Sequence, residues 1–382
     1  MSHQPASPAP RIFATADIGA SAIELLRQKG YDVEVYPHIE APPHAEIVTQ
    51  VRSGIAALIT TLRDRIDEEV FAAGAGTLRI VAQDSVGVDN IDRTAANRYH
   101  IPFTNTPEVL TEATAEFAFF IMGAVARKLW SSEELVRNQE WGAWHPWYPF
   151  LGDEVTGKTV AVIGVGRIGR AFAAKCVGLD MDILCYSHRR PDEQLAQAIQ
   201  QEMDLRFQAG LARRQARIRF VDLRTALSEA DFVSLHVPLI RPGQGDHPTW
   251  RMINEETLGW MKPTAYLINT ARGPVVDEAA LVRALTDNRL AGAALDVFEV
   301  EPLPAASPLR DAALRDRLRL FHHFGSGTRE TRLDMDPARG MAGRCVQALL
   351  DVLEGNYDGD AARMPFVVNK EAFVSPAAPG AR

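Results

Sequence analysis

A glycine-rich turn constrains the fold of this chain more than any other stretch. In "TVAVIGVGRIGRAFA", Gly164, Gly166 and Gly169 follow an apolar run and open a helical stretch. The first glycine permits a tight turn, the second lets a pyrophosphate approach the backbone, and the third allows close packing of helix on strand. Unpaired N–H groups at the start of the helix can then bind the phosphates. Because further short strands follow, the stretch predicts a dinucleotide-binding α/β unit.

Short apolar runs alternate with helical stretches along most of the chain. The runs before the glycine turn are "RIFATA", "YDVEVY", "IAALIT", "LRIVAQ" and "PFTNT". The runs after it are "DILCYS", "IRFV", "DFVSLHVP", "AYLINTA", "GAALDVF" and "LRLFHHF". This alternation predicts mostly parallel sheets covered by helices on both faces. Since 382 residues exceed one ordinary core, two α/β units are expected.

Three longer helices are also expected. Residues 112–138 are expected to form one long helix. Its run "ATAEFAFFIMGAVARKLW" is apolar on almost every side, which predicts that the helix is buried between domains. An aromatic-rich loop, "EWGAWHPWYPFLG", follows it. Residues 192–217 are polar and predict a surface helix, and a last helix is expected near 338–354.

Composition excludes several classes of protein. A net charge of −8 gives no general attraction to nucleic acid or to an anionic membrane, and "ARRQAR" is interpreted as a solvated helix face. The three cysteines show no paired spacing, which favours buried thiols in a reducing cytoplasm over a disulfide framework or a metal site. The start does not resemble a signal peptide, no apolar run is long enough to span a membrane, and 1–10 and 373–382 are expected to be flexible tails.

Three side chains are candidates for acid–base chemistry. Arg272 lies in "LINTARGPVVDEAAL", Glu301 precedes a proline in "ALDVFEVEP", and His323 lies in "FHHFGSGT". A guanidinium can present its planar fork to a carboxylate and a carbonyl, and histidine is the natural proton carrier near neutral pH. A carboxylate beside the imidazole would favour its protonated form. Each residue alone also fits a structural role, and sequence order does not establish that the three converge.

These motifs together resemble the D-isomer-specific 2-hydroxyacid dehydrogenases, and the resemblance runs from about Arg11 to Glu371. It implies two Rossmann-like doubly wound domains, with the dinucleotide-binding domain inserted in a flavodoxin-like substrate domain and a cleft between them. The implied substrate-binding domain is 11–106 with a returning helix in 331–372, and the implied cofactor domain is 107–330. Two segments, 192–217 and 241–250, depart from the family as surface elaborations of unassigned role.

The resemblance also implies roles for particular residues. Arg272 clamps the substrate's carboxylate and carbonyl, His323 exchanges a proton with the C2 oxygen, and Glu301 keeps His323 protonated. A glutamate at this position disfavours a formate dehydrogenase. The turn in "AQDSVGVDNID" holds the carboxylate through N–H groups of Ser85, Val86 and Gly87. The remaining positions assigned to the cofactor are Thr114, Gly164, Gly166, Arg167, Ile168, Gly169, Val237, Pro238, Thr270, Ala271 and Asp296. No metal is expected.

The aromatic-rich loop resembles that of the glyoxylate and hydroxypyruvate reductase branch. In that branch a tryptophan of the partner in a homodimer reaches over the active site, and Trp144 is the matching residue. Its alternative role is dimer packing without contact to substrate. We therefore expect reduction of a small 2-keto acid to the D-2-hydroxy acid by hydride transfer. The alternatives are a D-lactate, phosphoglycerate or phosphite type of dehydrogenase, or a dinucleotide-sensing scaffold similar to the co-repressors built on this fold.

The stretch "DILCYSHRR" bears on the choice of cofactor. An aspartate in the family accepts hydrogen bonds from the adenosine ribose and repels a 2′-phosphate, and Ser187 stands at that position. Ser187 can donate to a phosphate, and Arg189 or Arg190 can pair with it. NADP(H) is therefore the expected cofactor, with NAD(H) possible. The alternative is that both arginines are solvated loop residues.

Overall fold

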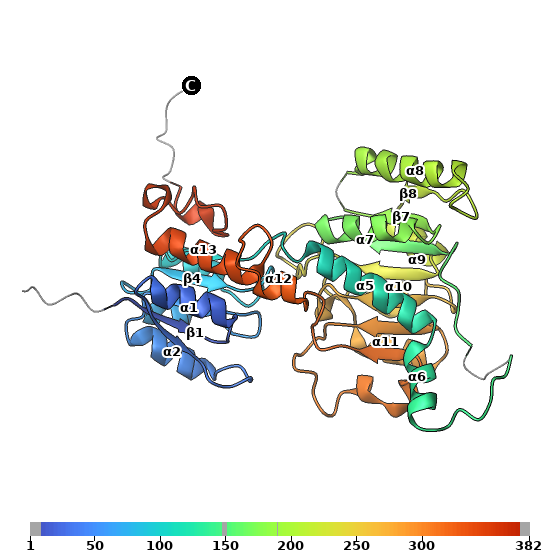
Figure 1. Ribbon diagram of the computed structural model, residues 1–382, viewed down its shortest axis with the longest axis horizontal. Coiled ribbons are helices and arrows are strands. Elements are labelled where there is room, and N and C mark those ends of the chain that lie inside the picture. Colours follow the sequence, from blue (N-terminus) through green and yellow to red (C-terminus); the bar gives the residue numbers. More distant parts are fainter. Residues whose placement is uncertain (1–8, 147–150, 189, 375–382) are drawn as a thin grey trace, which may run out of the picture. The chain divides into compact units, whose positions relative to one another are not determined.

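The computed structural model describes residues 9–146, 151–188 and 190–374, and the chain forms two compact units. The first comprises Met1–Leu110 and Gly327–Arg382, and the second comprises Thr111–Ser326. Each unit contains one parallel sheet covered by helices (Figure 1), so the expected α/β class is confirmed.

The first unit has a five-stranded sheet in the order β2-β1-β3-β4-β5, with all neighbours parallel. This is the flavodoxin-like order, in which ligands bind at the carboxyl ends of the strands. The strands are β1 (Arg11–Ala14), β2 (Asp32–Val35), β3 (Ala57–Thr60), β4 (Ile80–Gln83) and β5 (Phe103–Thr104).

Alternating side chains of this sheet bury two separate cores, as expected for a period of two along a strand. In β1, Ile12 and Ala14 pack with α1 (Ala20–Gln28) and α13 (Met341–Leu353). Phe13 points to the other face. It packs there against a core that draws on α2 (His44–Arg52), α3 (Glu68–Ala73) and α4 (Arg93–Arg98).

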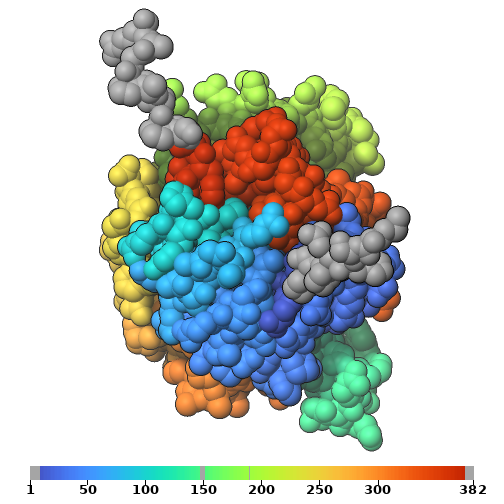
Figure 2. All heavy atoms as spheres, turned by 90° about the vertical axis from the view of Figure 1, so that its left-hand side faces the viewer, coloured from blue at the N-terminus to red at the C-terminus, as the bar shows by residue number. Residues whose placement is uncertain are grey.

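The chain that follows α13 returns to the edge of this sheet. Val367 forms an antiparallel bridge with Thr104 of β5. The Asn369 amide accepts the N–H of Phe103 at 3.0 Å and donates to the carbonyl of Ile101 at 3.1 Å. Figure 2 shows these C-terminal residues, in red, beside the cyan residues around β5. The remaining helical segments of this unit are α12 (Arg329–Leu333), η4 (Tyr357–Gly359) and η5 (Lys370–Ala372).

The second unit has a seven-stranded parallel sheet in the order β12-β11-β10-β9-β6-β7-β8. Read from β8, this is the doubly wound order of a Rossmann sheet with one added strand. The strands are β6 (Thr159–Ile163), β7 (Asp182–Tyr186), β8 (Ile218–Phe220), β9 (Phe232–Leu235), β10 (Tyr266–Asn269), β11 (Gly292–Leu295) and β12 (Leu318–Leu320).

Helices cover both faces of this second sheet. One core draws on α5, α7 and α8, and the other draws on α9, α10 and α11. Their bounds are α5 (Thr111–Ala126), α7 (Arg167–Val177), α8 (Glu193–Gln208), α9 (Leu223–Glu229), α10 (Glu255–Leu258) and α11 (Glu278–Thr286), with short turns η1 (Gly273–Val275), η2 (Pro308–Arg310) and η3 (Ala312–Leu314). The polar helix expected within 192–217 is α8, which ends at Gln208. The interpretation of "ARRQAR" as a helix face was therefore wrong, because residues 212–217 lie in the loop after α8.

The prediction of one long helix over 112–138 was wrong. The structure has two helices there, α5 and then α6 (Leu129–Arg137). Lys128 separates them with a left-handed backbone, φ 51°, which a continuous helix cannot contain. The buried apolar side chains belong to α5, whereas Ser131 is the buried residue of α6.

Two further observations concern the whole described chain. Cys176 and Cys185 are buried and free, as expected, and Cys345 is also buried and free. Within the described residues, we find no helix that combines the length and the apolar character needed to cross a bilayer.

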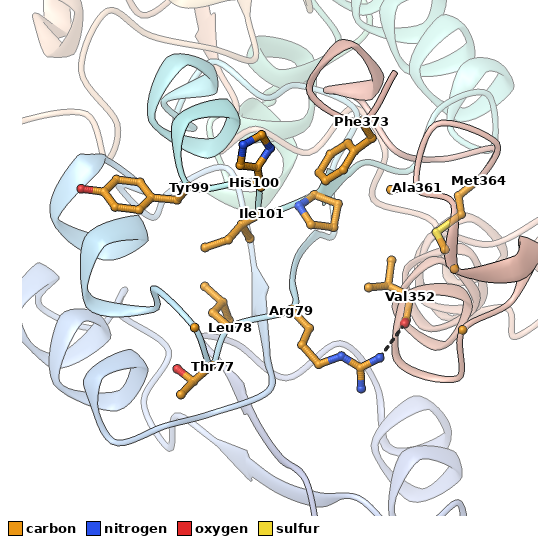
Figure 3. Close-up of a pocket in the computed structure, with 14 residues that line it drawn as sticks. Thr77, Leu78, Arg79, Tyr99, His100, Ile101, Val352, Ala361, Met364 and Phe373 are labelled. Atoms are coloured by element: carbon orange, nitrogen blue, oxygen red, sulfur yellow. Dashed lines mark hydrogen bonds between the residues drawn. The ribbon is translucent and has the colours of Figure 1, made fainter. Parts of the chain in front are cut away.

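A hollow of about 450 Å³ lies in the first unit at the amino ends of β4 and β5 (Figure 3). Arg79 lines it and donates to the carbonyls of Val352 and Leu353 at 3.0 Å each, which satisfies the end of α13. Because ligands of such sheets bind at the carboxyl edge, we do not assign the candidate site to this hollow.

Candidate active site

The three acid–base candidates follow three neighbouring strands of the second sheet. Arg272 follows β10, Glu301 follows β11 and His323 follows β12. These strands are adjacent and parallel, so their carboxyl ends lie at one edge. The sheet order thus places residues that are distant in sequence in the same region.

Glu301 and His323 form a hydrogen-bonded pair. Nδ1 of His323 lies 2.8 Å from Oε2 of Glu301, and Oε1 of Glu301 accepts the N–H of Phe298 at 3.0 Å. Burial alone would raise the pKa of Glu301. The hydrogen bond and charge of His323, the Phe298 N–H and the charge of Arg272 outweigh burial, so the pKa lies below its usual value. The geometry suits an imidazolium held by an ionised carboxylate.

Arg272 is positioned by the buried side chain of Asn269. The Asn269 amide accepts the N–H of Ala271 and donates to the carbonyl of Arg272, both at 3.0 Å. Nη1 of Arg272 donates to the carbonyl of Ala271 at 2.7 Å. The charge of Arg272 lowers the pKa of Glu301, so the structure brings all three candidates together.

The loop that carries His323 is held by Asp296. His323 has a left-handed backbone, φ 58°, and its N–H donates to the carbonyl of Asp296 at 2.8 Å. The Asp296 carboxylate accepts the N–H groups of Phe324 at 2.6 Å and Gly325 at 2.8 Å. Burial raises the pKa of Asp296, although these N–H groups oppose the shift. This positioning role was not foreseen from the sequence, and its contact with the cofactor stays a prediction.

The glycine turn has the geometry that a dinucleotide requires. Gly164 has φ 100°, and a Cβ there would lie 2.8 Å from the carbonyl of His236. A Cβ on Gly169 would lie 2.1 Å from the carbonyl of Gly164, so helix and strand pack as closely as only glycine allows. Gly166 is the N-cap of α7 without a side-chain hydrogen bond, and a Cβ there would meet no atom within 4 Å. The open space before these N–H groups fits a pyrophosphate.

The other positions assigned to the cofactor lie around the same edge of the sheet. Arg167 and Ile168 are in the first turn of α7, and Val237 and Pro238 follow β9. Thr270 and Ala271 follow β10, and the Thr270 hydroxyl is buried with no hydrogen-bond partner among the described residues. Such an orphaned hydroxyl is consistent with a polar ligand nearby. Thr114 is buried in α5 beside Gly325.

The end of β7 carries Ser187, His188 and Arg190, whereas Arg189 lies outside the described residues. Ser187 is half-buried, and Arg190 is exposed. The next acidic residue along the chain is Asp192, and its carboxylate already forms hydrogen bonds within the protein. Its carboxylate accepts from Arg170 at 2.5 Å and caps α8 through the N–H of Leu195 at 3.0 Å.

The expected carboxylate-binding turn follows β4 in the first unit. The Ser85 hydroxyl donates to the carbonyl of Gly87 at 2.7 Å, and Gln83 donates to that carbonyl at 2.9 Å. The carbonyl of Val86 accepts from Asn105 at 2.8 Å. With these carbonyls engaged, the N–H groups of the turn are the polar groups suited to an anion.

Sequence reasoning missed Asp84, which lies directly before this turn. One of its carboxylate oxygens is buried without a hydrogen-bond partner among the described residues. Burial raises the pKa of Asp84 to about 7, against the opposing charge of Arg332. A buried acid at the end of a strand gives no periodic signal, and only its position beside the turn could have drawn attention to it.

Trp144 lies in the loop that follows α6, and 78% of its surface is exposed. Part of the aromatic-rich loop, residues 147–150, lies outside the described residues. The structure therefore places Trp144 on the surface of the second unit, and a contact with substrate stays a prediction.

Comparison with known proteins places this site in a family. Residues 119–324 match the model described as "D-isomer specific 2-hydroxyacid dehydrogenase, NAD binding domain". The glyoxylate reductase of Pyrococcus furiosus is 41% identical over 95% of this chain and 96% of its own length. The glyoxylate reductase of Thermococcus litoralis is 37% identical over 96% and 98%. A crystal structure from Thermus thermophilus has a TM-score of 0.77 and 37% identity, covering 94% of this chain and 99% of that one.

The chain belongs to the D-isomer-specific 2-hydroxyacid dehydrogenase family. As a member, it is an oxidoreductase that acts on CH–OH groups, and its two-unit α/β arrangement is that of its structural relatives. The part that matches the NAD-binding model lies within the second unit of this 2-hydroxyacid dehydrogenase. That unit also carries the glycine turn and the Arg272, Glu301 and His323 cluster.

Proposed function

We propose that this dehydrogenase reduces a small 2-keto acid, such as glyoxylate or hydroxypyruvate, to the 2-hydroxy acid, here glycolate or D-glycerate. The observation that carries the proposal is the 2.8 Å hydrogen bond between Glu301 and His323 beside Arg272. Relatives named glyoxylate reductase, matched over most of this chain and of their own, support the choice of substrate.

The proposed chemistry assigns one task to each side chain. A bound nicotinamide cofactor supplies the hydride. His323 donates its proton to the C2 oxygen of the keto acid, and the carboxylate of Glu301 keeps it protonated beforehand. The planar fork of Arg272 binds the substrate's carboxylate and carbonyl oxygen. The N–H groups of Ser85, Val86 and Gly87 are a second carboxylate-binding element.

We further propose that NADP(H) is preferred over NAD(H). The sequence from Ser187 to Arg190 contains a hydroxyl, a histidine and two arginines but no acid to repel a 2′-phosphate. Ser187 and Arg190 follow β7, where the adenosine ribose of a Rossmann cofactor binds. Asp192 does not replace the missing acid, because Arg170 and the start of α8 hold its carboxylate.

We also propose a homodimer formed through α6 and the loop after it. The exposed apolar side chains of these segments are Leu129, Val136, Trp141, Trp144 and Leu151, and exposed apolar groups are typical of a protein–protein interface. In such a dimer Trp144 can reach the partner's active site. Light scattering coupled to size-exclusion chromatography would test this assembly, and a monomer at micromolar concentration would contradict it.

Steady-state kinetics on glyoxylate, hydroxypyruvate and pyruvate, each with NADH and NADPH, would test the proposed function. We expect kcat/KM to be highest for glyoxylate or hydroxypyruvate with NADPH. A clear preference for pyruvate would indicate a D-lactate type of enzyme. Tight binding of cofactor without turnover of any of the three acids would contradict a reductase and favour a dinucleotide-sensing scaffold.

A further inference from the structure

The 241–250 segment forms a closed loop between β9 and the residues before α10. Thr249 closes its base, because its buried hydroxyl accepts the N–H of Ile240 at 2.8 Å and donates to the carbonyl of Pro238 at 2.6 Å. The N–H groups of Thr249 and Trp250 both donate to the carbonyl of Ile240, at 2.9 and 3.1 Å. The base of the loop is therefore fixed to the end of β9.

The first half of the loop is also held by internal bonds. The Arg241 N–H donates to the side chain of Gln244 at 2.9 Å, and the Gln244 N–H donates to the carbonyl of Arg241 at 3.0 Å. Gly243 makes this turn possible with φ 84°. These hydrogen bonds thus hold the backbone of the loop that carries His247.

His247 meets His188 at the carboxyl edge of the second sheet. The two ring centroids lie 5.1 Å apart, with 34° between the ring planes. His188 directly follows Ser187 at the end of β7, and the loop follows β9. Since β7 and β9 both pair with β6, these two segments flank the glycine turn that follows β6. The loop therefore reaches the place where the adenosine end of the cofactor is expected.

The spacing of the two rings limits what they can bind. An aromatic base inserted between them would need centroids about 7 Å apart, so adenine does not fit between rings at 5.1 Å. Both rings are exposed and can instead direct ring N–H donors to an anion. Arg241 and Arg190 add positive charge to the same two segments, and Asp246 adds one negative charge. A phosphate monoester is the ligand that such donors suit.

We propose that the 241–250 loop forms one side of the binding site for the 2′-phosphate of NADP(H). His247 is then a specificity residue that donates a hydrogen bond to this phosphate from the side opposite His188. The inference rests on the proposed NADP(H) preference and extends it to a segment that departs from the family. It assigns no part in hydride or proton transfer to His247.

Binding of 2′,5′-ADP and 5′-AMP to the full chain tests the proposal, because the two ligands differ only in the 2′-phosphate. Isothermal titration calorimetry would compare the wild type with His247→Ala and His247→Asp. We expect His247→Ala to weaken 2′,5′-ADP binding roughly tenfold, the loss of one charge-assisted hydrogen bond, and to leave 5′-AMP binding unchanged. His247→Asp should weaken 2′,5′-ADP further through repulsion. His38→Ala, at an exposed histidine of the first unit, is the matched control.

Each result has a distinct meaning. Wild-type affinity of His247→Ala for 2′,5′-ADP, in a protein that prefers this ligand to 5′-AMP, would overturn the inference and leave the proposed cofactor preference intact. Equal weakening of both ligands would also overturn it, because His247 would then contact the shared part of the nucleotide. A wild type that does not discriminate between the ligands would overturn the proposed preference and this inference together.

Discussion

A Cβ atom on Gly273 would lie 1.9 Å from the carbonyl carbon of Phe298, so the backbone beside Arg272 passes Phe298 at a distance that only glycine permits. The N–H of Phe298 in turn donates to Glu301 at 3.0 Å. Gly273 thus links the loop that carries Arg272 to the loop that carries Glu301. The alignment of two candidate catalytic residues depends on a residue that has no side chain.

Gly273→Ala should therefore impair turnover. The added methyl group must push the two loops apart, which we expect to lower kcat roughly tenfold or more and to cost about 1–3 kcal/mol of unfolding free energy. Steady-state kinetics and urea unfolding would measure both effects. Gly123→Ala in α5 is the control, because a Cβ there would meet no atom within 4 Å and alanine favours a helix. Unchanged kinetics of Gly273→Ala would show that the loops are not coupled in this way.

Glu301→Gln should change the pH dependence of reduction. The neutral amide cannot stabilise a protonated His323 through its charge, so the alkaline limb of the kcat/KM profile should move to lower pH. The affinity for NADPH should not change, since Glu301 is not assigned to the cofactor. Glu68→Gln, at an exposed glutamate paired with Arg98, serves as the control. A profile that keeps its shape while kcat falls would argue against the relay.

Ser187→Asp should shift cofactor preference toward NAD(H). A carboxylate at this position accepts bonds from the ribose hydroxyls and repels a 2′-phosphate. We expect the ratio of kcat/KM with NADPH to that with NADH to fall roughly tenfold or more. Ser187→Ala separates the two effects, because it removes the hydroxyl without adding charge. If both variants kept the wild-type ratio, the 2′-phosphate would not be bound at Ser187.

Because of Asp84, the free energy of unfolding should decrease as the pH rises from about 4 to about 7. Burial raises the pKa of Asp84 in the folded chain to about 7 from 3.8, so the folded state binds more protons than the unfolded state within this window. The free energy of unfolding should then fall by roughly 1 kcal/mol per pH unit as pH rises through it, and level off above.

Asp84→Asn should remove this dependence and raise the unfolding free energy at pH 8 by about 2 kcal/mol. Denaturant unfolding across the pH range would measure both the slope and the gain. Asp32→Asn, at an exposed residue of β2, should leave the wild-type slope unchanged. The same slope in Asp84→Asn as in the wild type would assign the pH dependence to other groups.

The sequence allowed the α/β class, the glycine turn and the loops with Arg272, Glu301 and His323 to be predicted, because each depends on local pattern. The hydrogen bond between Glu301 and His323 depends on the order β12-β11-β10, which no local pattern contains. The break at Lys128 was missed for a related reason. Neither glycine nor proline stands at the break itself, and a lysine rarely adopts the left-handed backbone that Lys128 has, so no residue there indicated that the helix ends.

The contact between His188 and His247 illustrates the same limit. From the sequence, the 241–250 segment could be predicted to be a surface elaboration, but its position in the fold could not be predicted. The two histidines are brought together because β6 lies between β7 and β9 in the sheet. Asp84 was missed because burial at the end of a strand follows from the elements packed around it, here α12 and α13, and not from its neighbours in sequence.

The closure of the 241–250 loop at Thr249 has a consequence for how such a chain can diverge. A loop fastened at its base can gain, lose or exchange residues at its tip without disturbing the strand before it or the helix after it. The candidate catalytic side chains follow β10, β11 and β12, away from this loop in the chain. Substitutions in the loop can therefore alter the affinity for one cofactor or another during evolution, while the catalytic side chains stay the same.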